Sequence, residues 1–227
     1  MFKYRFFQVI LAIAVVMLIV SSAVFISFQG VNISEAEYTS EMTGRTFETD
    51  GADGSETALT EFEAWLEYSI IADGLKETGN NVDFDKGNVK LCDYNLTQLR
   101  QLKKVKDEAK RMMFLSVILL IIGFLAVKKR RMYECVVWGG VAASVIGMVS
   151  LILLAVSGGG IFYGVREMVF KGRYDVFFSG DDRLISLIPD NLGLRMFLIY
   201  TGVILAGLVI TIIVRLISWR KTQPHKF

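Results

Sequence analysis

Apolar residues fall into four long blocks separated by polar segments. The blocks cover 6–28, 112–127, 136–156 and 196–214. Because a helix rises 1.5 Å per residue, about 20 apolar residues cross the hydrocarbon core of a bilayer. The second block is shorter than this, but a helix that starts near Leu96 supplies the missing turns outside the core. The pattern therefore predicts an all-α membrane protein with four transmembrane helices.

The polar segments predict the rest of the organisation. We expect residues 29–111 and 157–195 to form two loops on one side of the membrane, with a small α(+β) cap in the first. A basic hairpin at 128–135 and a tail at 215–227 then lie on the other side. We expect the first block to stay as an uncleaved anchor, because it is longer than the apolar region of a usual signal peptide.

Basic residues are concentrated on one side of this predicted topology. The segments before the first block, between the second and third, and after the fourth carry Lys3, Arg5, Lys128, Lys129, Arg130, Arg131, Arg215, Arg220, Lys221 and Lys226. Their one acid is Glu134. Since short cytoplasmic loops are enriched in Lys and Arg, we expect both termini inside and the two long loops outside. The net charge of +2 hides this asymmetry and does not indicate a nucleic-acid partner.

The first loop contains one clear helical pattern. Residues 55–72 have apolar side chains at helical spacing, with Ser55 as a candidate cap and acids in the first turns. We expect residues 29–54 to form irregular chain or weak strands. The alternation in residues 82–94 predicts a small hairpin or turn.

The end of the first loop predicts a basic helix that continues into the second block without a Gly or Pro before Gly123. Its apolar stripe comprises Leu99, Leu102, Val105, Ala109 and Met112. Its other faces carry Gln98, Arg100, Gln101, Lys103, Lys104, Lys106 and Lys110. One interpretation is a face that touches anionic headgroups, at about 1 kcal/mol per Lys or Arg. The other is a surface that handles a substrate.

In the second loop, aromatic residues alternate with charges. Phe177 and Phe178 precede an acidic pair, Asp181 and Asp182. The stretch 183–193 then predicts a short amphipathic helix, capped by one of these acids and ended by Pro189. We expect this helix to lie flat on the bilayer.

Small residues in the third and fourth blocks predict close helix packing. Gly139, Ala143 and Gly147 recur every four residues, and Gly202 and Ala206 do the same in the fourth block. No ionisable residue stands in the middle of any block, which disfavours a proton pump or secondary transporter.

Candidate chemistry is sparse. The chain has one histidine, His225, in the basic tail. No Ser–His–Asp or Cys–His set can therefore form outside, and no P-loop or zinc motif is present, so we expect no cofactor or metal. Cys92 and Cys135 fall on opposite sides of the predicted topology and cannot pair.

The order of spans and loops, together with "FFSGDDRLISLIPDNL" and "TQLRQLKKVKD", resembles the DUF1461 family of integral membrane proteins in Gram-positive bacteria. This is the family of the lipoprotein intramolecular transacylase Lit. Its second outer loop carries a pattern like FFPGG followed by LIxLFPE. The matching residues here are Phe177, Phe178, Gly180, Leu184, Ile185, Leu187, Ile188 and Pro189.

The resemblance also implies where a site would lie. A family motif like SHxxDVK matches 100–106, with Gln101 at the histidine position and Lys104 at the aspartate position. It implies an acyl transfer within a lipidated cysteine at the outer surface, with the histidine as general base. Glutamine cannot accept a proton near neutral pH, and a general base contributes about 10²- to 10⁴-fold. The implied ligand-binding residues are Arg100, Lys103, Lys104, Asp107, Phe177, Phe178, Asp181, Asp182 and Arg183.

Three hypotheses remain open at this point. The chain binds a lipid or lipoprotein at the outer leaflet without the histidine chemistry, it is an acyl-transfer enzyme that uses another base, or it is an accessory subunit of a membrane complex. Lys103, Lys104 and Asp107 are the candidates for an alternative base.

Overall fold

The structure is a computed structural model of the whole chain. It describes residues 2–50, 56–77, 83, 84, 86, 87, 89, 91, 93–126, 129–157, 186–189 and 191–222. The chain divides into two compact units. The first comprises Met1–Ile26, Glu108–Gly164 and Leu198–Phe227. The second comprises Ser27–Asp107 and Val165–Phe197.

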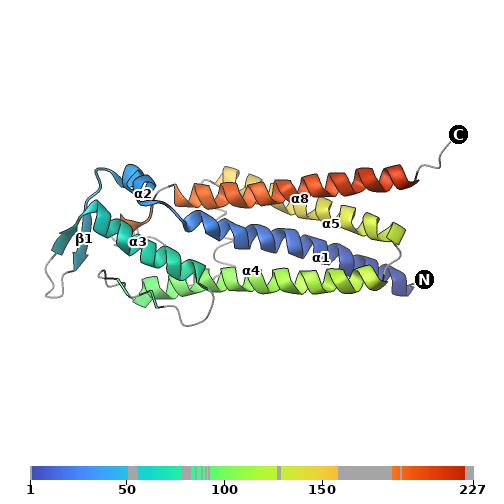
Figure 1. Ribbon diagram of the computed structural model, residues 1–227, viewed down its shortest axis with the longest axis horizontal. Helices are drawn as coiled ribbons and strands as arrows, with labels where there is room; N and C mark the ends of the chain where they lie inside the picture. Colours follow the sequence, from blue (N-terminus) through green and yellow to red (C-terminus); the bar gives the residue numbers. More distant parts are fainter. Residues whose placement is uncertain are drawn as a thin grey trace. The chain divides into compact units, whose positions relative to one another are not determined.

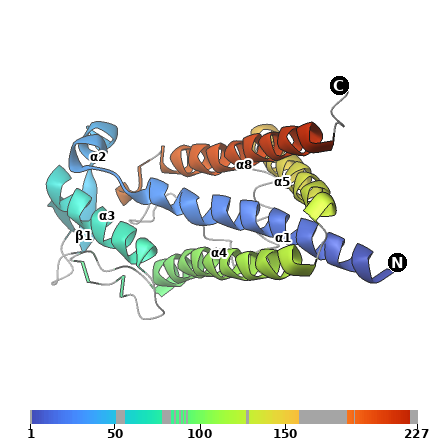
Figure 2. The ribbon, with the colours of Figure 1, turned by 45° about the vertical axis from the view of Figure 1, so that its right-hand side comes forward.

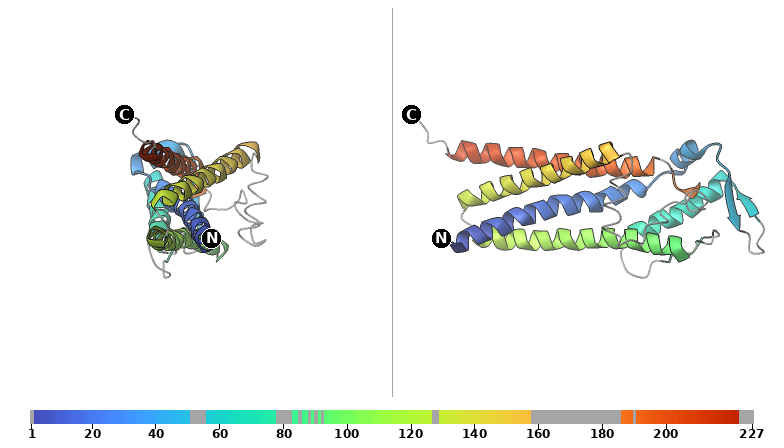
Figure 3. Two further views of the ribbon diagram at one scale, coloured as in Figure 1. Left: turned by 90° about the vertical axis from the view of Figure 1, so that its right-hand side faces the viewer. Right: turned by 180° about the vertical axis from the view of Figure 1, so that it is seen from behind.

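Four long helices supply the first unit. They are α1 (Phe2–Ser27), α4 (Asp93–Ala126), α5 (Lys129–Ser157) and α8 (Leu192–Thr222), of which α4 and α8 begin in the second unit. Within the described residues, all four contain a stretch that is long and apolar enough to cross a membrane. They run side by side, and α1 begins, α4 ends, α5 begins and α8 ends at the same end of this unit (Figures 1 and 3). The fold class predicted from the apolar blocks, all-α with four transmembrane helices, is confirmed.

The outer surface of these helices is apolar. Large side chains such as Phe114, Ile118, Trp138, Leu198 and Val209 are exposed along them. Such a surface is unfavourable in water and is the surface that lipid chains cover. The hydroxyl groups of Ser21, Ser116, Ser144 and Thr211 donate to the carbonyl oxygen four residues earlier, so each is satisfied inside its own helix.

Small residues bring the helices together, but not all at the predicted positions. Gly147 of α5 faces Ile204 of α8, which confirms the predicted contact between the third and fourth spans. Gly139 instead faces α1, where a Cβ atom would lie 2.6 Å from the carbonyl oxygen of Ala12. In α8 the predicted pair is wrong, because Gly202 has nothing within 4 Å and Ala206 is exposed. Gly207 is the α8 glycine that packs on α1, against Ile19.

The second unit contains the short elements η1 (Phe28–Val31), α2 (Glu35–Met42), β1 (Phe47–Asp50), β2 (Glu56–Leu59) and α3 (Glu61–Lys76) (Figure 2). β1 and β2 pair antiparallel, with Phe47 opposite Leu59. Between α2 and β1, Gly44 has a φ of 82°, a left-handed conformation that suits glycine.

Two local expectations for this unit are wrong: the cap at Ser55 and the irregular or strand-like course of residues 35–42. Residues 56–59 form a strand, so Ser55 does not cap the following helix. Thr60 caps it, in a capping box with Glu63 whose hydrogen bonds lower the pKa of the Glu63 carboxyl group. Residues 35–42 form a helix, and Ser34 caps it by accepting a hydrogen bond from the Glu37 amide.

A hairpin lies at 47–59, and its strand at 47–50 is one of the weak strands expected for residues 29–54. Several residues of 82–94 lie outside the described residues, so the hairpin or turn expected there stays a prediction.

Two tyrosines fill the core between α2 and α3. The rings of Tyr38 and Tyr68 lie 5.1 Å apart, and both side chains are almost fully buried. The Tyr68 hydroxyl donates to the carbonyl oxygen of Val31 at 2.7 Å. Burial raises the pKa of both phenols, because the charged form would lose its hydration.

Candidate functional site

The predicted basic helix is the first half of α4. It runs without interruption from Asp93 to Ala126, as predicted from the absence of a breaker before Gly123. Arg100 and Lys104 are exposed, Gln101 and Asp107 are half-buried, and Lys103 is buried. The five candidate residues on this helix therefore do not share one face.

Lys103 and Lys106 face protein rather than headgroups, contrary to the expectation that they lie on an open basic face. The Lys106 ammonium group donates to the carbonyl oxygens of Leu75 at 2.6 Å, Lys76 at 2.5 Å and Glu77 at 3.1 Å. Lys103 donates to Glu77 at 3.2 Å. These carbonyls end α3 and have no partner within that helix, and a cation also suits the negative end of the helix dipole. Both lysines therefore hold α4 to the end of α3.

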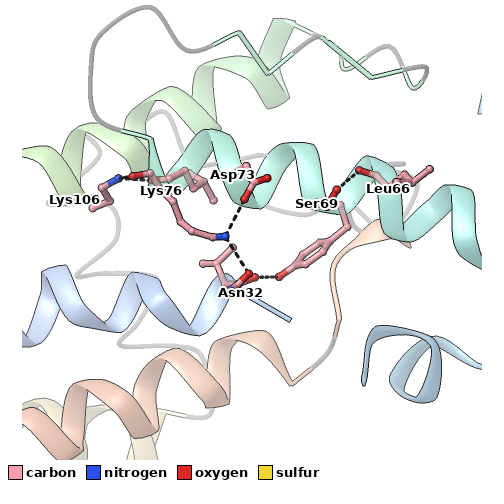
Figure 4. Close-up of polar contacts among 9 residues, drawn as sticks. Asn32, Leu66, Ser69, Asp73, Lys76 and Lys106 are labelled. Carbon is pink, nitrogen blue, oxygen red and sulfur yellow. Dashed lines mark hydrogen bonds and ion pairs between the residues drawn. The ribbon is translucent and has the colours of Figure 1, made fainter. Parts of the chain in front are cut away.

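The end of α3 is bound on a second side as well. Lys76 donates to the Asn32 side-chain oxygen at 3.0 Å and pairs with Asp73 at 2.8 Å. Figure 4 shows Lys76 pointing to Asn32 and Asp73 while Lys106 points at the backbone of the same turn. The α3 terminus is thus a junction between α4 and the segment that follows α1.

After Lys103 and Lys106, two candidate cations of α4 remain, Arg100 and Lys104, and both are exposed. Arg100 and Lys104 lie one helical turn apart, so their side chains are neighbours on the helix surface. Among the described residues, neither forms a hydrogen bond or an ion pair. Farther along the same face, Arg111 is paired with Glu108 at 2.9 Å. Arg100 and Lys104 are therefore two neighbouring exposed cations, an arrangement that suits an anionic group.

Proton-transfer groups are limited on this helix. Gln101 cannot act as a base, and His225 lies outside the described residues. Asp107 has one carboxylate oxygen, Oδ1, that is buried and forms no hydrogen bond with the described residues. The described residues contain no group of three His, Cys, Asp or Glu side chains able to hold a metal ion.

The second loop is described from Ser186, so Phe177, Phe178, Asp181, Asp182 and Arg183 lie outside the described residues. Cys92 does too. Ser186 and Leu187 are helical, within the predicted short helix. Leu187 and Pro189 are buried in protein, and the Leu187 carbonyl oxygen accepts a 2.8 Å hydrogen bond from the Tyr38 hydroxyl. Leu187 therefore packs on protein and not on the bilayer. Residues 183–185 lie outside the described residues, so the position of the predicted helix on the bilayer stays a prediction.

An ion cluster that the sequence analysis missed lies at the end of this loop. Arg195, in the first turns of α8, donates to the carboxylates of Glu37 and Glu41 on α2, the latter at 3.3 Å. The hydrogen bond from Arg195 holds the pKa of Glu37 below its ordinary value. A signal for α2 was present, since Ser34 and Glu37 have the spacing of a capping box. No local pattern indicated that Glu37 pairs with Arg195, which lies 158 residues away in the chain.

Comparison with solved structures places these elements in a known fold. The chain is similar to the membrane integral lipoprotein intramolecular transacylase Lit from Bacillus cereus, with a TM-score of 0.73, 12% identity and 97% of each chain covered. The chain has a Lit-like fold. Two variants of Lit, with one histidine replaced by arginine or by alanine, match with TM-scores of 0.70 and identities of 11% and 13%. The matches cover 97% of this chain and 93% and 96% of the two variants.

No family model matches the chain, and no curated protein matches it. The Lit-like fold and the four apolar helices identify a multi-pass membrane protein. At this level of identity the likeness extends to the fold alone.

Proposed function

We propose that this protein binds a lipid or a lipid-modified protein at the outer leaflet of a cell membrane and does not perform a histidine-dependent acyl transfer. The division of the α4 cations into two faces carries the proposal. Lys103 and Lys106 are bonded to the end of α3, whereas Arg100 and Lys104 are exposed and unpaired among the described residues. In this account Arg100 and Lys104 bind the anionic part of the ligand.

The ligand class is supported by the fold. Lit, by its name, acts on lipoproteins, and its fold is the one found here. Phe177, Phe178, Asp181, Asp182 and Arg183 are proposed as a second set of contacts, on the basis of the sequence alone. We further propose that both termini are cytoplasmic and that the cell is a Gram-positive bacterium. The common end where α1 begins and α8 ends supports a location of both termini on one side of the membrane (Figure 1).

We propose no acyl transfer because the chain lacks a histidine at the predicted site. The one histidine of the chain is in the tail, and Gln101 occupies the position that resembles the family histidine. Without a group that accepts a proton near neutral pH, a typical factor of about 10²- to 10⁴-fold is lost. Binding needs no such group.

The proposal is tested with a photoreactive lipopeptide bearing a diacylglyceryl cysteine, added to the full protein in nanodiscs. At about 1 kcal/mol per cation, replacing Arg100 and Lys104 by alanine should weaken binding about 30-fold. Lys86→Ala removes another exposed cation of the second unit and should leave labelling unchanged. Equal labelling of the double variant and the wild type, or no labelling of the wild type, contradicts the proposal.

A further inference from the structure

Helix α2 is short, yet it makes the contacts that hold the end of the second loop. Its eight residues are too few to be stable alone in water, so tertiary contacts must maintain it. Tyr38 and Met42 are fully buried against the rest of the second unit. Helix α2 also contacts Leu187 and Arg195.

Three residues on one face of α2 make these contacts. Glu37 and Glu41 are four apart, so their carboxylates lie on the same side of the helix and both reach Arg195. Tyr38, beside Glu37, donates its buried hydroxyl to Leu187. The segment from Leu187 to Arg195 is therefore held by α2 at both of its ends.

The position of Arg195 is unusual for a basic residue. It lies in the first turns of α8, and its amide donates to the carbonyl oxygen of Asn191. The positive end of the helix dipole disfavours a cation there. The Arg195 side chain is 24% exposed, and that of Glu41 is 18% exposed, so the pair is partly shielded from solvent and salt. The carboxylates of Glu37 and Glu41 supply the negative charge that the start of α8 lacks.

We infer that α2 positions the end of the second outer loop, and we call this helix the strap. The positioning residues are Tyr38 of α2 and Arg195 of α8. Because Tyr38 also stacks on Tyr68 of α3, the strap connects the second loop to the same helix whose end is held by Lys106. In the proposed function, the described end of the second loop is then fixed to the same helix, α3, as the ligand-binding helix α4. Only the statement about ligand binding rests on the proposed function; the contacts of α2 do not.

Hydrogen exchange read by mass spectrometry tests the strap directly in the full protein. Arg195→Ala and Tyr38→Phe should each raise exchange about tenfold in peptides covering 186–195, because each removes a buried or charge-assisted hydrogen bond. The part of α8 from 204 to 213 should exchange as in the wild type. Unchanged exchange in 186–195, or an equal rise in both regions, overturns the inference.

A charge swap separates positioning from general loss of structure. Arg195→Glu alone should open the strap, and adding Glu37→Lys and Glu41→Lys should restore slow exchange by restoring opposite charges. If the swap exchanges as fast as Arg195→Glu, the strap is wrong.

Lipopeptide labelling of the same variants distinguishes this inference from the proposed function. Labelling that falls in Arg195→Glu and returns in the swap supports the strap. If the wild type is not labelled but exchange follows the predicted pattern, the proposed function fails and the strap stands. If the wild type is labelled but exchange in 186–195 is insensitive to all variants, the strap fails and the function stands.

Discussion

The Nζ atom of Lys106 lies 2.6 Å from the backbone carbonyl oxygen of Leu75, which joins α4 to the end of α3. Two more carbonyl oxygens of the same turn accept from this ammonium group. The sequence pattern placed Lys106 on a polar face open to a ligand, but its ammonium group holds α4 to the end of α3. Arg100 and Lys104 of the same helix are exposed, and the proposed function assigns ligand binding to them.

Replacing Lys106 by methionine should destabilise the protein by about 2 kcal/mol, because a charge-assisted hydrogen bond contributes about 1.5–3 kcal/mol and buried carbonyls lose their donor. Thermal unfolding in mild detergent measures this. Lys104→Met, at an exposed position of the same helix, is the matched control and should change stability by less than about 0.5 kcal/mol. Equal effects of the two substitutions would contradict the assigned role of Lys106.

Gly139→Ala should destabilise the helix bundle, because the added Cβ atom meets the backbone oxygen of Ala12 at 2.6 Å and α1 must move away. Gly202→Ala adds the same atom where nothing lies within 4 Å. It should be neutral or slightly stabilising, since alanine favours helix by about 1 kcal/mol over glycine. Melting temperatures of the two variants in the same detergent compare them. A Gly202 variant as unstable as the Gly139 variant would show that the packing is different.

The buried tyrosine pair should make the fold sensitive to alkali. The pKa of Tyr38 and of Tyr68 is raised in the folded state, so their contribution to stability is full below the ordinary phenol pKa of about 10. It is lost as the pH rises through the raised value. Absorbance titration near 295 nm should show a late-ionising tyrosine fraction, and Tyr38→Phe should reduce that fraction. A late-ionising fraction that is the same in Tyr38→Phe as in the wild type would contradict the buried core.

Much of the fold could be predicted from the sequence because lipid imposes a simple requirement on helix length and polarity. The four apolar blocks and the unbroken α4 both follow from it. The second unit was harder, since short elements depend on caps and tertiary contacts. Thr60 and Glu63 form the box that starts α3, while Ser55 has Ala58 at the corresponding position.

The site was predicted less completely, for a physical reason. Helical periodicity separates the apolar face of α4 from its polar faces, but it does not tell which polar face meets protein. The partners of Lys103 and Lys106 are backbone carbonyls, which leave no trace in the side-chain pattern. The same holds for Tyr38, whose partner is the carbonyl group of Leu187.

A gain-of-function variant tests whether a missing base explains the missing chemistry. In bacteria that lack Lit, mass spectrometry of lipoprotein N-termini should find no lyso-form lipoprotein with an N-acyl cysteine when the wild-type chain is expressed. Gln101→His with Lys104→Asp should produce some, because an imidazole supplies the proton acceptor. Gln101→Asn with Lys104→Asp is the control without a base. Lyso-form lipoprotein made by the wild type would show that another group serves as the base.

The most direct test of the account uses the purified wild-type protein in liposomes with a diacylglyceryl-cysteine lipopeptide. After incubation, the protein is captured and the retained lipopeptide is analysed by tandem mass spectrometry. The account predicts that lipopeptide is retained through Arg100 and Lys104 and that its cysteine amine is still free. An acyl group on that amine, or no retained lipopeptide, would contradict it.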